Sequence, residues 1–445
     1  MYTRASSLCR HASSARRERG VVFILAVFAV VLLTVLVVGI TAAVRVELLA
    51  SRSGLDRVRS FSLAQAGLNE ARAILAYEDQ TVDALTDEWG PDAEQPLDDP
   101  HGLGDGFYRV RVSDGCGRID INEADFLTLT HLTGDQAVAA AIIDWRDADD
   151  EPVTPEGAEA AYYESLPYPY RPRNAPFETI GELLLVRGVT PEMLFGTRER
   201  RGLADLVTVE SLSADTDPAG DPRLEVNELL GVSGMGEELA ARQVGKWSGV
   251  ITQEVITHLL DWLPSLPTAR YTSISQIADA LSFYGIDFLP VLDALRVRPA
   301  QEGGFGPPVP PGWSPNVPAA VGKVNVNTAP PEVLAALPGS SPDVAQAFVE
   351  RRQNAPFTSL REVAELMLEQ PDGRRTVFAN MIDHVTTRSS IFMIESMGRT
   401  YTGRTFRTLE AMVTRSQGNV VIVRQAEEDW PLPPPEERRT KIARR

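Results

Sequence analysis

Carboxylate side chains gather in one short stretch of this sequence, and together they could bind a metal ion. Residues 144–159 hold seven of them, beginning Asp-Trp-Arg-Asp-Ala-Asp-Asp-Glu. Calcium accepts about six to eight oxygen ligands in loose geometry, so a dense acidic loop suits it. The candidate calcium ligands are Asp147, Asp149, Asp150 and Glu159. The spacing is not that of an EF-hand, and a solvated acidic loop is the alternative interpretation.

Signs of catalysis are few. Five histidines are scattered through the 445 residues without metal-ligand spacing, and neither a Gly-x-Ser-x-Gly motif nor a phosphate-binding loop occurs. The two cysteines are Cys9 and Cys116, and the second, between two glycines, is expected to be a small buried apolar side chain. The sequence therefore predicts a protein that is not an enzyme.

The charge is strongly acidic. The formal net charge is −18, and because residues 1–20 carry five arginines against one glutamate, everything after Gly20 carries −22. Nucleic-acid affinity comes mainly from Lys and Arg displacing counterions, so such a chain is not expected to bind nucleic acid. Divalent cations are the more natural ionic partners.

The carboxylates must be positioned by a chain that is held in a membrane. Residues 21–44 carry no charge and are rich in Val, Leu, Ile and Ala. At about 1.5 Å of helical rise per residue they cross a hydrocarbon core of about 30 Å. The run is longer than a secretory signal needs. The basic flank before it places the leader in the cytoplasm and the remaining chain outside.

Helical periodicity continues beyond the membrane. Apolar residues recur at spacings of three and four from Leu48 to Leu75. We therefore expect one helix of about 55 residues that leaves the bilayer near Val44, ends near Tyr77 and packs its outer half on a domain.

The strand signals lie far apart in the sequence. An acidic loop at 79–105 precedes an alternating segment at 107–112, and three more segments follow at 391–397, 405–413 and 420–424, the last two joined by a hairpin turn at 416–419. The predicted fold is α+β: a pilin-like long N-terminal helix on a small antiparallel sheet, with a large inserted all-α domain. The expected boundaries are 1–20 (leader), 21–44 (membrane half of the helix), 45–115 (outer helix, loop and first strand), 116–388 (insertion), 389–426 (last strands) and 427–445 (Pro-rich, basic tail).

The insertion contains a threefold repeat, with copies at about 117–188, 222–285 and 322–385 and a Pro/Gly linker at 303–322. Each copy opens as basic-apolar-x-apolar-Asn, at 118–122, 223–227 and 323–327, and closes as aromatic-x-Ser/Thr-aliphatic-x-Glu/Gln-aliphatic, at 177–183, 271–277 and 357–363. Between these motifs lie a glycine turn (Gly134, Gly234, Gly339) and a helix of small residues that includes Ala240 in copy two. We expect the opening Asn of each copy to be a helix N-cap.

Each copy resembles a helix-hairpin-helix unit, in which a glycine turn lets two helices approach closely. DNA-binding versions hold phosphate with basic residues near the turn, whereas these turns carry acids, as in Thr-Gly134-Asp-Gln. The resemblance therefore indicates helix packing rather than DNA contact.

The junction Arg19-Gly20-Val21 resembles a type IV prepilin processing site, with Gly20 last in the leader and Val21 first in the mature chain. The resemblance implies cleavage and N-methylation there by a membrane aspartyl protease, the prepilin peptidase. Most pilins carry a glutamate at the fifth mature position, where this chain has Leu25. That absence suits a subunit with no neighbour ahead of it, since an unpaired carboxylate is costly in the bilayer.

The acidic run, Tyr162-Tyr163, the segment 173–177, Val186-Arg-Gly188 and Val326-Asn-Thr-Ala-Pro330 resemble the type II secretion pseudopilin K family. The resemblance implies an inner-membrane, single-pass minor pseudopilin at the tip of a periplasmic pseudopilus, needed to export folded proteins across the outer membrane. Implied partners are other minor pseudopilins, the major pseudopilin and the prepilin peptidase, with secreted cargo and the outer-membrane secretin as further candidates. The alternatives are a membrane-anchored DNA-uptake protein and a minor pilin of a type IV pilus.

Overall fold

The computed structural model describes residues 11–231, 247, 249–298, 309–311, 313–314, 317–370, 374–403 and 405–428, with side chains from Val21 onward. Outside the described residues lie part of the leader with Cys9, the glycine turn and small-residue helix of copy two (Gly234, Ala240), much of the 303–322 linker, and the tail from 429.

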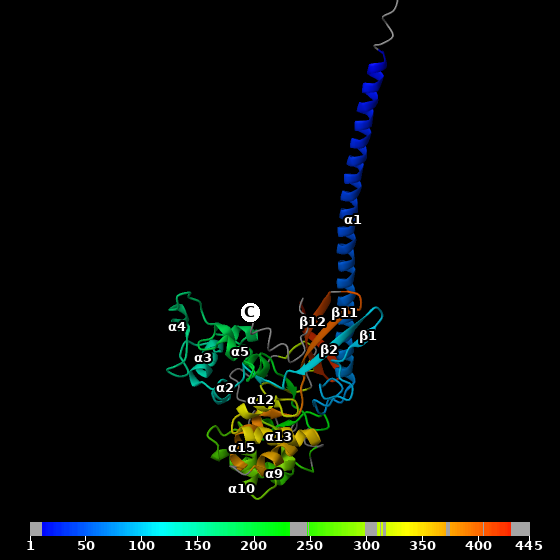
Figure 1. The fold of residues 1–445 in the computed structure, drawn as a ribbon. Helices are drawn as coiled ribbons and strands as arrows, with labels where there is room; N and C mark the ends of the chain where they lie inside the picture. Colours follow the sequence, from blue (N-terminus) through cyan, green and yellow to red (C-terminus); the bar gives the residue numbers. More distant parts are fainter. Residues whose placement is uncertain are drawn as a thin grey trace, which may run out of the picture.

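One very long helix dominates the architecture (Figure 1). Helix α1 runs from His11 to Tyr77, and its apolar side chains are exposed as far as Val58. Beyond that point one face is buried, including Ala64, Leu68 and Leu75 at 0% exposure. The prediction of a single helix that continues past the apolar segment and packs its outer half on a domain is therefore confirmed.

The outer half of α1 packs on a five-stranded antiparallel sheet of order β1-β2-β11-β12-β13. The strands are β1 His101–Leu103, β2 Gly106–Asp114, β11 Ile391–Thr400, β12 Phe406–Ser416 and β13 Asn419–Glu428. β2 pairs with β11 over nine residue pairs although the two are far apart in sequence, so the chain between them is an insertion. The predicted hairpin turn is confirmed, with positive φ at Gln417 (49°) and Gly418 (81°) joining β12 to β13.

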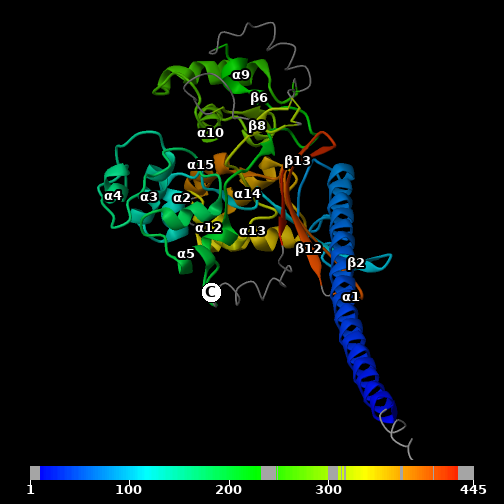
Figure 2. The ribbon, with the colours of Figure 1, turned by 90° about the horizontal axis from the view of Figure 1, so that it is seen from above.

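The inserted chain lies beside the sheet, on the side away from α1 (Figures 1 and 2). Its α-helices are α2 Phe126–Thr133, α3 Gln136–Arg146, α4 Ala160–Glu164, α5 Pro191–Phe195, α6 Leu203–Leu206, α7 Val226–Leu229, α9 Gln253–Trp262, α10 Ile274–Phe283, α11 Leu289–Leu292, α12 Pro331–Ala336, α13 Pro342–Asn354, α14 Leu360–Glu369 and α15 Arg374–Met381. The 3-10 helices in the described part of the insertion are η1 Ile180–Leu185, η2 Leu263–Ser265 and η3 Ile382–His384. Gly134 and Gly339 have φ of 75° and 74° between the paired helices α2–α3 and α12–α13, so the predicted glycine turns are present in copies one and three.

The prediction that the insertion is all-α is wrong. In each copy the opening segment pairs in parallel with a strand that follows the copy's last helices: β3 Ile119–Asp120 with β4 Val207–Thr208, β6 Leu224–Glu225 with β7 Leu295–Arg296, and β9 Val324–Asn325 with β10 Val385–Thr386. A further pair joins β5 Ser213–Ala214 to β8 Ala319–Ala320. Strands of two residues are too short for alternation to reveal them. We call the three closed segments unit one (117–210), unit two (222–298) and unit three (322–388).

The opening asparagines are not helix N-caps, which corrects that prediction. The caps of α2 and α7 are Asp125 and Glu225. Each asparagine side chain instead accepts from the backbone N–H, and donates to the carbonyl, of the aromatic residue that begins the closing motif. The pairs are Asn122 with Phe177 (2.7 and 3.1 Å), Asn227 with Tyr271 (2.9 and 2.9 Å) and Asn327 with Phe357 (2.8 and 2.9 Å). The two motifs that identify the repeat are therefore bound to each other in every unit.

The three units divide between two hydrophobic cores. Units one and three share one core, in which Leu129 and Ile142 lie with Val333 and Phe348. Unit two has its own core around residues such as Leu259 and Tyr271, and it also contributes Ile274, Ala278 and Leu292 to the shared core. It docks on unit three through Asp383, which accepts from the Ser273 hydroxyl (2.6 Å) and the Ile274 N–H (2.9 Å).

A buried polar network joins the sheet to the insertion. Asn325 of unit three donates to the Asp83 carbonyl (3.0 Å) and to Asp114 Oδ2 (3.1 Å), and Ser389 donates to Asp114 Oδ2 (2.6 Å). Cys116 lies beside it, buried as predicted, and burial raises the pKa of its thiol. The predicted acidic loop 79–105 thus holds a buried carboxylate, Asp83, that the sequence pattern did not reveal.

Candidate metal centre

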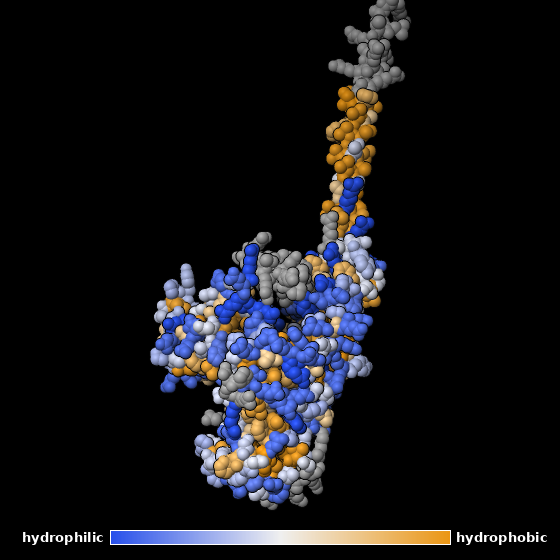
Figure 3. Space-filling model, turned by 60° about the horizontal axis from the view of Figure 1, so that its bottom comes forward, coloured by the Kyte–Doolittle hydropathy of each residue, from blue (hydrophilic) through white to orange (hydrophobic). Residues whose placement is uncertain are grey.

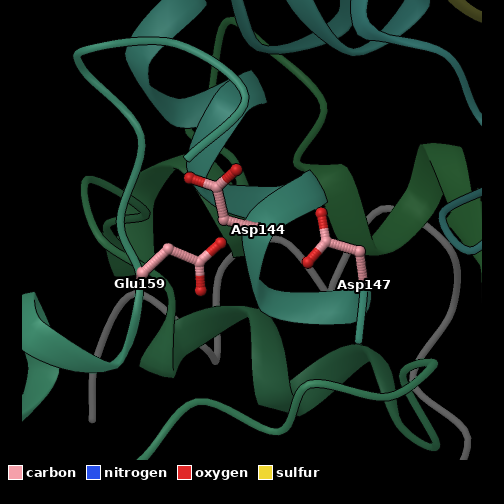
Figure 4. Close-up of side chains that lie close together, drawn as sticks. All are labelled: Asp144, Asp147 and Glu159. Carbon is pink, nitrogen blue, oxygen red and sulfur yellow. The ribbon is translucent and has the colours of Figure 1, made fainter. Parts of the chain in front are cut away.

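The C-terminal end of α3 and the N-terminal end of α4 bring three carboxylates together. Asp144 lies in the last turn of α3, Asp147 is the residue that ends it, and Glu159 immediately precedes α4 without capping that helix. Figure 4 shows the three side chains converging from these two helix ends. One oxygen of each lies within 4.8 Å of an oxygen of each of the others.

The centre is shielded from solvent and incompletely hydrogen-bonded. Asp144 is 0% and Glu159 7% exposed. Asp144 accepts from the N–H groups of Val153 (2.9 Å) and Ala158 (2.6 Å), which hold the acidic loop over the end of α3. Both Glu159 oxygens and Asp147 Oδ1 are buried without a hydrogen-bond partner among the described residues. Buried carboxylate oxygens are costly in that state, so the site is suited to a cation.

Electrostatics support the same conclusion. Burial raises the pKa of Glu159 to about 7, and the carboxylates of Asp144, Asp147, Asp150 and Asp149 add to that rise. Burial and neighbouring carboxylates also raise the pKa of Asp147. Like charges held this close favour either a shared proton or a bound positive ion. An all-oxygen donor set is the kind that calcium prefers.

The acidic loop fits the centre closely. A Cβ on Gly157 would lie 2.1 Å from Asp144 Oδ2, so a larger residue here would displace either the Asp144 carboxylate or the loop. Arg187 donates to the carbonyls of Glu156 and Gly157, both at 3.1 Å, and lies over the Tyr162 ring. The loop that carries Glu159 is therefore fixed from both sides.

Of the four candidate ligands, the structure brings two together, Asp147 and Glu159. Asp149 and Asp150 are exposed and lie outside the cluster, where Asp149 accepts from the Glu151 N–H (2.9 Å) and Asp150 from the Asn174 amide (3.2 Å). The third member, Asp144, was counted in the acidic run but not among the candidate ligands. Its position three residues before Asp147, one helical turn away, was the available signal.

The processing positions lie in α1. The helix continues through the Gly20–Val21 bond, and Val21 and Leu25 are 57% and 60% exposed. Residues Val21–Tyr77 form the one helix in the described part of the chain that is long and apolar enough to cross a membrane. The hydroxyls of Thr34 and Thr41 donate to the carbonyls four residues earlier, both at 2.7 Å, which satisfies them without water.

Two parts of the insertion match a known protein family. Sequence models of "Type II secretion system (T2SS), protein K" match residues 125–198 and 324–382, in units one and three. The chain is 26% identical over 198 residues to the type II secretion system protein K of Pseudomonas aeruginosa, a match that covers 39% of this chain and spans 58% of the relative's length. A solved GspK-GspI-GspJ complex from the type 2 secretion system of enterotoxigenic Escherichia coli aligns with 86% of this chain and 100% of the matched chain, at 12% identity and a TM-score of 0.44.

Proposed function

Since the chain belongs to the type II secretion system protein K family, we propose that it is a minor pseudopilin forming the tip of a periplasmic pseudopilus. Its role would be structural and non-catalytic, in the export of folded proteins across the outer membrane. The observation that carries the proposal is that the two matched segments, 125–198 and 324–382, build one shared core on a chain with one long helix whose apolar half is exposed.

The exposed half of α1 supports this assembly role. The large apolar side chains of α1 from Val21 to Val58 are exposed, so they are available to enter a membrane and afterwards to pack against other helices. We propose that the peptidase cuts after Gly20, with the leader in the cytoplasm and the remainder in the periplasm. The proposed helix partners are the other minor pseudopilins and the major pseudopilin. Leu25 brings no carboxylate into the membrane, which suits the first subunit of the filament.

The insertion would serve packing rather than DNA binding. We propose that units one and three are helix-hairpin-helix folds whose glycine turns, at Gly134 and Gly339, let paired helices approach closely. The net charge of −22 beyond the leader disfavours phosphate contact. The family match does not favour the DNA-uptake or type IV pilus alternatives.

Export provides the direct test. We expect deletion of the gene to stop type II export, and the full chain to restore it and to co-purify with the other minor pseudopilins. We also expect mass spectrometry to find a methylated Val21 at the mature N-terminus. Unimpaired export after deletion, or recovery without any pseudopilin partner, would contradict the proposal.

We further propose that Asp144, Asp147 and Glu159 hold calcium. The ion would supply positive charge that neutralises the three carboxylates and fixes the acidic loop between α3 and α4. The unpartnered Glu159 oxygens are the observation that supports it. Nearby Asp149 and Asp150 could contribute through the charge they add around the site.

The calcium proposal predicts a pH-dependent stabilisation. In the chelated protein the Glu159 pKa of about 7 exceeds its usual value, so the folded state binds the proton more tightly and loses stability as pH rises towards 7. Calcium competes with that proton. We therefore expect calcium to raise the melting temperature more at pH 8 than at pH 5.5, measured by thermal unfolding after chelation.

Glu159→Gln should weaken calcium binding at least about tenfold in calorimetry, because it removes a ligand charge. Glu151→Gln, a change to an exposed carboxylate in the same loop, is the matched control and should bind as the native chain does. The proposal fails if calcium produces neither heat nor a shift in melting temperature, or if both variants respond equally.

A further inference from the structure

Unit two carries a row of rings, two exposed and two half-buried, that neither the metal centre nor the membrane helix explains. The ring of His258 stacks on that of Tyr284 at 4.1 Å, Tyr284 contacts Phe283 at 5.1 Å, and Phe283 contacts Trp262 at 5.1 Å. Phe283 is 71% exposed although it lies within this row. Tyr284 is 36% exposed, and the four rings form what we call the aromatic patch.

The patch lies at the end of the molecule remote from the membrane. Helices α9 and α10 are at the opposite end from the apolar part of α1 in Figure 1, and Figure 3 shows apolar side chains exposed on that end. Unit two also lies outside both segments that match the family. Contiguous exposed apolar surface usually marks an interaction site, and aromatic side chains contribute most to such sites.

Charge identifies the kind of partner. Glu254, Asp261 and Asp287 are exposed beside the patch in sequence, and Glu254 lies 3.9 Å from the His258 ring. Arg375 of unit three lies near in space, but it pairs with Asp279 of α10, one turn before Phe283, so its charge is already matched. A second copy of this chain would set the same carboxylates against each other, and an anionic lipid surface would be repelled. A protein segment that carries Lys or Arg beside its apolar residues could pack on the rings and pair with the carboxylates at the same time.

We propose that the aromatic patch is a docking surface for a protein segment in which aliphatic or aromatic residues are flanked by Lys or Arg. The inference depends on the proposed function in one respect only: if the chain is a pseudopilin, the patch faces away from the membrane and the filament. The surface would then meet a protein outside the pseudopilus, whose aromatic or aliphatic side chains pack on Phe283 while its basic residues pair with Glu254 and Asp261.

Two labelled peptides test the proposal against the full chain in lipid nanodiscs, with empty nanodiscs as the blank. One has the core Lys-Leu-Phe-Leu-Lys and the other Glu-Leu-Phe-Leu-Glu. Fluorescence anisotropy should show the basic peptide binding at least about tenfold more tightly than the acidic one. Phe283→Ser should weaken binding of the basic peptide about tenfold. Tyr168→Ser removes an aromatic side chain that is 89% exposed in unit one and should change nothing.

Reversing the charge of two carboxylates beside the aromatic patch provides the second test. Glu254→Lys combined with Asp261→Lys should shift preference towards the acidic peptide. Equal binding of the two peptides, or unchanged binding by Phe283→Ser, would overturn the proposal, and so would a dimer in sedimentation that only Phe283→Ser abolishes. Co-purification with the minor pseudopilins is measured on the same variants. If the native chain does not co-purify with the minor pseudopilins, the proposed function is contradicted. If co-purification is retained but Phe283→Ser binds the peptide as the native chain does, only the proposal about the aromatic patch is contradicted.

Discussion

Replacing Asp83 with alanine should destabilise the folded chain by about 3–5 kcal/mol, the cost of breaking a buried ion pair from one side. Asp83 is 0% exposed and pairs with Arg415, whose side chain is 2% exposed. The same carboxylate accepts from the Ser389 N–H at 2.8 Å. Without it, the Arg415 guanidinium stays buried over the Phe392 ring and lacks its counter-charge. Urea unfolding of the solubilised chain measures the loss.

This ion pair should matter for more than local stability. Asp83 follows α1, Arg415 is the second-last residue of β12, and Ser389 leads from unit three into β11, so the pair connects the sheet to the insertion. We therefore expect Asp83→Ala to increase hydrogen exchange at the sheet–insertion junction, around Asn325 and Ser389, before it affects the core of unit two.

Matched variants separate this pair from an ordinary surface interaction. Glu164→Ala breaks the exposed Arg171–Glu164 pair and should cost no more than about 0.5 kcal/mol. Arg415→Met should cost less than Asp83→Ala, because burial raises the pKa of Asp83 and the carboxyl can take up a proton. If Asp83→Ala were as mild as Glu164→Ala, the pair would not stabilise the junction.

The sequence predicted the parts of the fold that follow a local period. The long helix and strands β2, β11, β12 and β13 each repeat apolar residues at a regular interval, so their positions followed from the pattern. Strand β1, His101–Leu103, lies instead in the segment 79–105 that was expected to be a loop, because three residues are too few to show alternation. The junction could not be predicted in this way. Asp83 and Arg415 are single polar residues 332 positions apart, Asp114 and Asn325 are 211 apart, and only the folded chain brings each pair together.

The repeats show where local interpretation failed. Both ends of each copy were recognised, but Asn327 was expected to cap the helix that follows it. An Asn before a helix has that local signature, whereas its contact with Phe357 spans 30 residues. For the same reason, only two of the three carboxylates of the candidate metal centre were predicted. Glu159 and Asp147 belong to an obvious acidic loop, while Asp144 lies in an apolar helix and turns inward.

Gly398→Val should separate α1 from the sheet and destabilise the chain by about 3 kcal/mol or more, at the upper end of overpacking costs. A Cβ on Gly398 would lie 2.1 Å from the Ser60 carbonyl oxygen and 2.4 Å from the Ala64 nitrogen. Both are backbone atoms of α1, so no side chain can rotate to make room. We expect faster hydrogen exchange in α1 near Leu68, measured by mass spectrometry.

Gly54→Val is the matched control, because Gly54 lies in α1 itself and a Cβ there meets no atom within 4 Å. It should unfold at nearly the same urea concentration as the native chain. In the proposed function α1 anchors the chain, and in the structure the sheet packs on it. A sheet and insertion no longer fixed to α1 could not be held at a defined angle to the proposed neighbouring subunits. Gly398→Val should therefore lose export even where the protein accumulates, whereas equal stability and export in both variants would show that the close approach at Gly398 is not needed.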